Sequence, residues 1–123
     1  MTRTTQPNLI RGDDYAPARA FLASPLAALR PDFAGRALAR IEAQHDELGE
    51  SYLYGSLAAL VRELAEEAED LGAWAALLAD RVERDDRPDA DRARALLAGI
   101  AQRAGEADAL IGELRRMLAW PAS

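Results

Sequence analysis

Apolar residues recur every three or four positions over long stretches of this chain, which is the period of an amphipathic α-helix. The pattern is longest after Ser56, where one apolar stripe continues to Val82. Its members are Leu57, Leu60, Val61, Leu64, Ala68, Leu71, Ala75, Leu78 and Val82. Serine is a favoured N-cap residue, because its hydroxyl accepts a hydrogen bond from a free N–H of the first turn. The pattern therefore predicts a long helix that begins after Ser56.

A second long stripe closes the chain. The charged stretch 83–89 contains Pro88 and predicts a loop, after which Asp89 or Asp91 can cap a helix that ends at Trp120–Pro121. The apolar residues of this helix are Leu97, Ile100, Ala104, Ala107, Ile111, Leu114 and Leu118. Spacings that alternate between three and four are typical of a seam packed against another helix. The partner helix can belong to the same chain or to a second subunit.

A third helical pattern precedes these two. Asp32 is the expected N-cap after Pro31, and the helix is predicted to run to about Glu50 or Leu53. Its periodic residues are Phe33, Ala37, Leu38, Ile41, His45 and Leu48. We predict that it ends before the glycine of the Tyr54–Gly55–Ser56 break.

The first 29 residues have weaker signals. Residues 1–14 are polar and show no sustained period, so we expect a flexible N-terminal arm. Between residues 15 and 29, Pro17 and Pro25 allow a short helix, a turn at Ser24–Pro25 and a second short turn of helix.

Composition agrees with this pattern. Alanine and leucine dominate the 123 residues and β-branched residues are few, which favours helices. We predict a single all-α domain over residues 15–123, a hairpin or bundle of three long helices plus short N-terminal helices, and expect it to be oligomeric. No apolar run has membrane-spanning length and no signal-peptide core is recognisable, so a cytoplasmic location is expected. The absence of cysteine excludes disulfides and thiolate chemistry.

The formal net charge of −6 argues against a partner that is a nucleic acid polymer, because affinity for phosphate backbones requires clustered positive charge. Every cation is an arginine; lysine is absent.

Two short acidic clusters are the candidate chemistry. Glu47 and Glu50 lie near the end of the first long predicted helix, and Glu67 and Asp70 lie on the next. Residues three apart share one helix face, so two such pairs on facing helices offer four hard oxygen ligands, the kind that magnesium prefers. Four gathered carboxylates would repel one another unless a cation or raised pKa values compensated. Convergence of the four would therefore indicate a metal site.

The spacing of these clusters resembles a known family. The string Asp46-Glu47-Leu48-Gly49-Glu50, followed by Glu67-Ala68-Glu69-Asp70-Leu71-Gly72-Ala73-Trp74, is similar to the signature of the all-α NTP pyrophosphatase superfamily, which includes MazG-like proteins. The resemblance implies that Glu47, Glu50, Glu67 and Asp70 bind Mg²⁺. It also implies hydrolysis of a nucleoside triphosphate to the monophosphate and pyrophosphate. The alternative registers 63–66 and 66–69 exist in the second cluster, and the choice of Glu67 and Asp70 follows the family.

Other residues can be placed around such a site. Glu47 is the candidate to orient or deprotonate the attacking water. The family's phosphate-binding lysine is missing, and Arg81, Arg84 or Arg103 are the candidates to replace it. The aromatic residues Tyr52, Tyr54 and Trp74 are candidates to stack on the nucleobase.

Two hypotheses follow. The first is a magnesium-dependent nucleoside triphosphate pyrophosphohydrolase that acts as a homo-oligomer. The alternative is a non-catalytic helical module for oligomerisation or partner binding, in which the acidic strings are solvated surface and the seam between Leu97 and Leu118 is the functional face.

Overall fold

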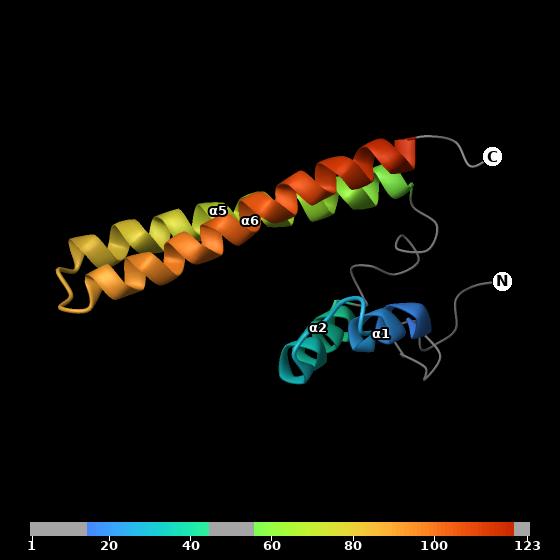
Figure 1. The fold of residues 1–123 in the computed structure, drawn as a ribbon, viewed down its shortest axis with the longest axis horizontal. Coiled ribbons are helices and arrows are strands. Elements are labelled where there is room, and N and C mark those ends of the chain that lie inside the picture. The colour runs from blue at the N-terminus through green and yellow to red at the C-terminus, as the bar shows by residue number, and fades with distance from the viewer. Residues whose placement is uncertain (1–14, 45–55, 120–123) are drawn as a thin grey trace, which may run out of the picture. The chain divides into compact units, whose positions relative to one another are not determined.

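The computed structural model describes residues 15–44 and 56–119. By its contacts the chain divides into two compact units, Met1–Tyr54 and Gly55–Ser123, and each is described by itself. The regular elements of the described ranges are all α-helices, as predicted (Figure 1). The single domain over residues 15–123 stays a prediction, and the N-terminal arm lies outside the described residues.

The first unit contains a short helix, α1 (Ala16–Ala23). Tyr15 precedes it with a positive φ of 61° and is buried. Pro17 stands in the first turn, where the missing N–H costs no helical hydrogen bond. Ser24 ends the helix, and its hydroxyl donates to the carbonyl of Phe21 at 2.7 Å. The predicted short helix and the turn after it are confirmed.

The next helix, α2 (Pro31–Ala43), is shorter and begins earlier than expected. Arg30, not Asp32, is the N-cap residue, because Pro31 has the φ and the missing N–H that suit the first helical position. Asp32 lies inside the first turn, where its Oδ1 accepts a hydrogen bond from the Phe33 N–H at 2.9 Å. The helix ends at Ala43, where Gln44 leaves helical geometry with φ −94° and ψ 10°.

The second unit is a hairpin of two long antiparallel helices, α5 (Leu57–Arg84) and α6 (Ala90–Ala119), which lie side by side (Figure 1). Ser56 caps α5 as predicted, and its Oγ accepts a hydrogen bond from the Ala59 N–H at 3.1 Å. The predicted charged loop connects the helices. Within it Asp86 has a φ of 53°, and the Arg87 Nε donates to the Asp89 Oδ1 at 2.8 Å.

The seam between the two helices confirms most of the prediction for α6 and part of it for α5. In α6 the predicted residues Ala104 and Ile111 are buried, whereas the predicted Ile100 is 41% exposed. In α5 small or branched residues form a buried to half-buried row, of which Val61, Ala68, Ala75 and Val82 belong to the predicted stripe and Ala65, Gly72 and Ala79 do not. The leucines of the expected stripe at 57, 64, 71 and 78 are exposed instead.

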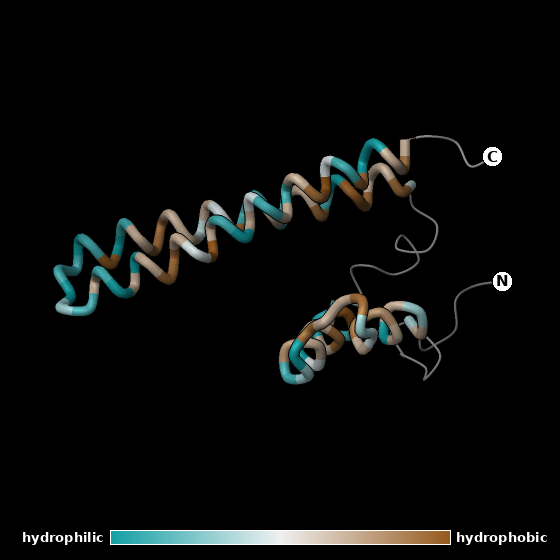
Figure 2. The backbone as a smooth tube through the Cα atoms, viewed as in Figure 1, coloured by the Kyte–Doolittle hydropathy of each residue, from teal (hydrophilic) through white to brown (hydrophobic). Residues whose placement is uncertain are grey.

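Small residues explain which side of α5 faces α6. A Cβ built on Gly72 would lie 4.0 Å from the Cβ of Ala104, so the backbones approach closely at mid-hairpin. The core is correspondingly thin: its central cluster is Val61, Ala65 and Ile111, and no described side chain is below 2% exposed. Apolar residues recur along both helices (Figure 2), and several of the large ones are exposed. None of the described helices is long and apolar enough to cross a membrane.

Candidate functional site

The structure places two of the four predicted magnesium ligands. Glu67 and Asp70 lie one turn apart on α5, and both side chains are exposed. Neither forms an ion pair with another described residue. Glu47 and Glu50 lie outside the described residues. The described part of the site is thus a pair of solvated carboxylates one helical turn apart.

A metal ion needs more donors than this pair offers. Within residues 15–44 and 56–119, no three Asp, Glu or His side chains are grouped so that they could hold a metal ion. Glu67 and Asp70 have the hard oxygen atoms that Mg²⁺ prefers, but octahedral coordination by these two alone leaves most positions to water or substrate. The four-carboxylate site stays a prediction that depends on Glu47 and Glu50.

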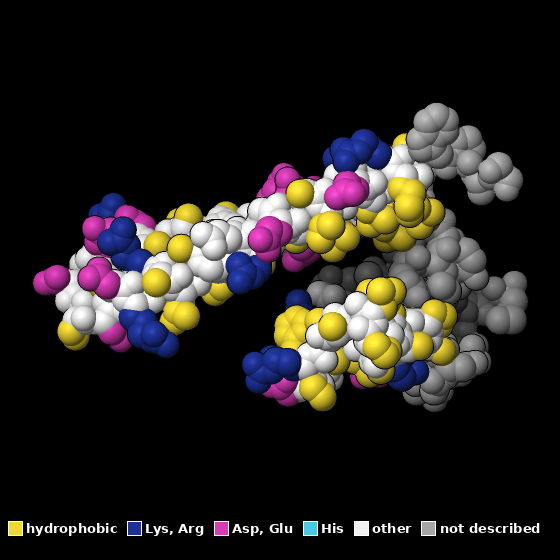
Figure 3. Space-filling view, in the orientation of Figure 1, with side chains coloured by type: hydrophobic (Ala, Val, Ile, Leu, Met, Phe, Trp, Pro, Cys, Tyr) yellow, Lys and Arg dark blue, Asp and Glu magenta, His cyan; other side chains and the backbone are white. Residues whose placement is uncertain are grey.

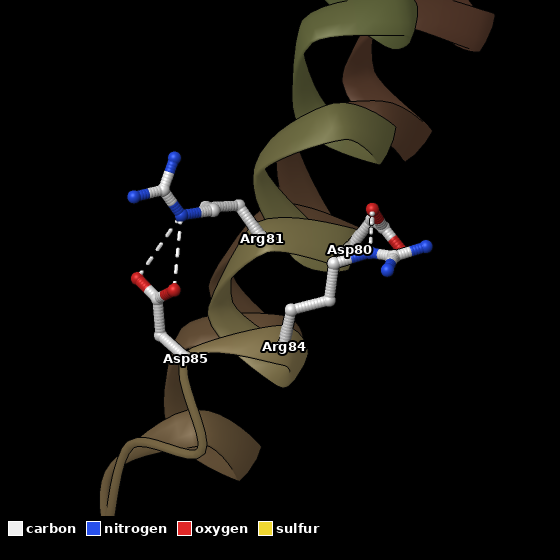
Figure 4. A network of polar contacts seen from close by, with 4 residues as sticks. All are labelled: Asp80, Arg81, Arg84 and Asp85. Carbon is white, nitrogen blue, oxygen red and sulfur yellow. Dashed lines mark hydrogen bonds and ion pairs between the residues drawn. The ribbon is translucent and has the colours of Figure 1, made fainter.

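The arginines proposed to bind phosphate differ in their surroundings. The Nε of Arg81 donates to both carboxylate oxygens of Asp85, at 3.0 and 3.2 Å, and the Nε of Arg84 donates to Asp80 at 2.8 Å (Figure 4). Both pairs lie in the last turns of α5, where the negative end of the helix dipole disfavours an anion. Arg103 is exposed on α6 without an ion pair to another described residue. Of the three, Arg103 is the most available for a phosphate.

Of the aromatic candidates, Trp74 is described and Tyr52 and Tyr54 lie outside the described ranges. Trp74 follows Asp70 by one turn and is 62% exposed, so its ring is accessible to a ligand or to another protein surface. Accessibility suits both hypotheses equally.

The clearest electrostatic effect lies in the hairpin loop. The hydrogen bond between Arg87 and Asp89 lowers the pKa of the Asp89 carboxyl and raises the pKa of Arg87. Both side chains are exposed, and their ion pair links two residues of the loop between α5 and α6.

Sequence reasoning missed the most distinctive surface of the hairpin, which we call the leucine face. It consists of large apolar side chains outside the seam, spaced by multiples of seven residues on each helix. Its members are Leu57, Leu64, Leu71 and Leu78 of α5 and Leu96, Leu110 and Met117 of α6. Their exposed fractions range from 46% at Leu71 to 65% at Leu110. Hydrophobic side chains are visible at the hairpin surface between the charged ones (Figure 3).

The two rows of the leucine face flank the same side of the seam. In α5, Leu71 directly precedes the seam residue Gly72, and in α6, Leu110 directly precedes the seam residue Ile111. Two antiparallel helices are related by a two-fold axis perpendicular to the hairpin, so equivalent positions of the two helices lie on one side. The seven residues therefore form one apolar surface with the seam along its middle.

The opposite flank of the seam has a different character. The equivalent positions there are mostly charged: Arg62, Glu69, Ala76 and Glu83 in α5 and Arg94, Ala101, Asp108 and Arg115 in α6. A solvated helix surface normally has such residues. The sequence contains a signal for this contrast: leucines recur every seven residues, and each directly precedes a small or seam-forming residue.

Comparisons with known proteins identify no relative: no family model, no curated protein and no solved structure matches this chain.

Proposed function

We propose that this chain is a non-catalytic helical oligomerisation module, in which the leucine face of one hairpin packs against the leucine face of a second copy. One observation carries the proposal. The small residues Ala65, Gly72 and Ala75 lie in the seam, while the seven large apolar side chains of the leucine face lie outside it and are exposed. Helices obtain most of their stability from packing an apolar face, so a hairpin that leaves its leucines exposed has an incomplete core.

The free energy available from this face is sufficient for association. Fully burying a leucine contributes about 1.5–3 kcal/mol, so covering one that is half exposed contributes about 1 kcal/mol. Seven residues on each of two copies then give on the order of 14 kcal/mol, against the ~4–15 kcal/mol that association costs. This gain exceeds most of the range of the association cost, so burial of the leucine face favours a dimer.

The length of the face favours a second hairpin over the helices of the chain's own first unit. The α5 row from Leu57 to Leu78 extends for about 32 Å at 1.5 Å per residue. By the same measure α1, with 8 residues, is about 12 Å long and α2, with 13 residues, about 20 Å. The 28-residue α5 and 30-residue α6 of a second copy are long enough to cover the whole row.

A matched pair of variants tests the proposal by light-scattering molar mass. L71E/L110E puts a carboxylate on each row of the leucine face and should give a monomer of the 13.3 kDa chain. L77E/A109E makes the same change of charge at exposed positions away from both the seam and the face, and should keep the wild-type dimer mass. Equal masses for the two variants would overturn the assignment of the face.

Magnesium-dependent pyrophosphohydrolysis of nucleoside triphosphates is a second candidate function. It is favoured by Glu67 and Asp70, which lie one turn apart and are exposed without an ion pair to a described residue. With Glu47 and Glu50 they would hold the cation, which when bound neutralises the polyphosphate. In this scheme Glu47 orients the water, Arg103 contacts phosphate, and Trp74, with Tyr52 and Tyr54, stacks on the base.

Pyrophosphate release tests this candidate. The assay uses the full chain with Mg²⁺ and each common nucleoside triphosphate. E67A/D70A should abolish release, whereas E66A/E69A, an acidic pair of the same spacing on the same helix, should retain it. No release by the wild-type chain, or equal rates in the two variants, would contradict the enzymatic role.

A further inference from the structure

The leucine face differs between its two helices, and this difference bears on how two copies can pair. The α5 row is apolar at all four of its positions. The α6 row is interrupted, because Arg103 occupies the position between Leu96 and Leu110. A closed dimer is two-fold symmetric, and two face-to-face arrangements satisfy that symmetry. Either the hairpin loops lie at the same end, with α5 on α6 of the second copy, or they lie at opposite ends, with each helix on its own equivalent.

Loops at the same end would bring unfavourable groups together. Gly72 and Ala104 lie at one level of the hairpin, so Leu71 would pack beside Arg103 of the second copy. Glu67, which borders the face between Leu64 and Leu71, would come level with residue 109, between Glu106 and Glu113 of the second copy. Like charges at such positions oppose association.

Arg81 adds to the same problem. It borders the face one turn beyond Leu78. In this arrangement it would come level with residue 95 of the second copy, one turn from Arg92, which borders the α6 row. Each repulsive contact occurs twice, because the two-fold axis repeats it.

Loops at opposite ends avoid most of these contacts. The α5 row then packs on itself, with Leu64 beside Leu71 of the second copy and Leu57 beside Leu78. Leu60 and Trp74, which border the row, come level with each other and extend the apolar contact. The uncharged α5 row of one copy thus packs on the uncharged α5 row of the second copy.

The same axis also gives Arg103 a partner. The two-fold axis passes near Glu67 on α5. Because Gly72 is level with Ala104, the axis crosses α6 between residues 108 and 109. It therefore brings Arg103 close to the level of Glu113 of the second copy. Two like-charge contacts remain at the border of the face: Glu67 meets its own equivalent, and Glu106 comes level with residue 111, near Glu113 of the second copy.

We infer that the dimer is a four-helix bundle with its two loops at opposite ends, α5 against α5 and α6 against α6 of the second copy. This inference rests on the proposed self-association through the leucine face. It specifies the partner surface for each helix.

Pulsed electron–electron double resonance on the spin-labelled full chain measures the distance between labels in the two copies and so distinguishes the two arrangements. The chain has no cysteine, so an engineered one is labelled uniquely, and E83C places the label at the loop end of α5, on the charged flank. Residue 83 lies about 16 residues from the axis, so labels in the two copies should be about 45 Å apart with the loops at opposite ends. Loops at the same end place the two labels at one level on the outer sides of the bundle, about 25–30 Å apart, because the helix layers are ~8–10 Å apart and each label lies on the flank that points away from the second copy. R94C, on α6 at nearly the same level, repeats the measurement if E83C folds poorly.

The outcomes separate the inference from the function beneath it. A distance near 45 Å that disappears in L71E/L110E and persists in L77E/A109E supports both. A distance of about 25–30 Å overturns the arrangement and leaves self-association intact. Absence of any intermolecular distance in the labelled chain overturns the proposed oligomerisation as well.

Discussion

The contact between Gly72 and Ala104 gives the sharpest test of how α5 faces α6. A Cβ added at Gly72 meets the Ala104 Cβ at 4.0 Å, an ordinary van der Waals separation. Gly72→Ala should therefore stabilise each hairpin by about 1 kcal/mol, the difference in helix propensity between alanine and glycine. Gly72→Leu adds three more carbons where that contact leaves no room. Gly105 is the matched control, because a Cβ there meets nothing within 4 Å.

Comparing leucine at these two sites cancels the gain in helix propensity. What remains is the cost of overpacking at Gly72, about 1–3 kcal/mol per hairpin. Urea unfolding followed by circular dichroism at one protein concentration gives the difference, provided that the slope m is the same for the variants. We expect Gly105→Leu to be more stable than wild type. We expect Gly72→Leu to be less stable than Gly105→Leu. Equal stability of the two leucine variants would show that Gly72 does not lie in the seam.

Further predictions concern the cap, the loop and the interface. Ser56→Ala should lower the stability of the hairpin by about 1 kcal/mol in urea unfolding, and Ser56→Asp should restore it, because only the alanine cannot accept the capping bond. Arg87 lowers the pKa of Asp89, so their hydrogen bond stabilises the fold above the ordinary carboxyl pKa, and this contribution is lost as the pH falls through the lowered value. The difference in unfolding free energy between wild type and Asp89→Asn should therefore shrink in acid, and also in high salt, which screens the pair. A melting temperature that rises with protein concentration in wild type should become independent of concentration in L71E/L110E, because only an associating chain is stabilised by mass action.

The sequence was sufficient to predict the long helices. The apolar period and Ser56 gave the start of α5, and Pro88 with its charged neighbours gave the loop. The first long helix was harder, since Pro31 moves the cap to Arg30 and α2 ends at Ala43.

The face of α5 could not be predicted correctly from hydrophobicity alone. Leucines and small residues form two adjacent rows on this helix, and hydrophobicity favours the leucine row. The helices pack through the row of small residues, which includes Ala75 of the predicted stripe but also Ala65 and Gly72 outside it, because small residues permit close approach, and that choice depends on the partner helix. When two adjacent rows of one helix are both apolar, the periodicity of that helix does not determine which row packs against the partner helix.

The candidate metal site depends on tertiary arrangement even more strongly. Spacing places Glu67 and Asp70 on one helix, and the structure confirms that they lie one turn apart. Whether Glu47 and Glu50 approach them is decided by how the two units pack, which no periodicity encodes.

Sedimentation equilibrium of the wild-type full chain measures whether the chain self-associates. We expect a species of about twice the 13.3 kDa monomer mass that dissociates on dilution. A single species of monomer mass at every concentration would contradict it, since the leucine face would then be open surface.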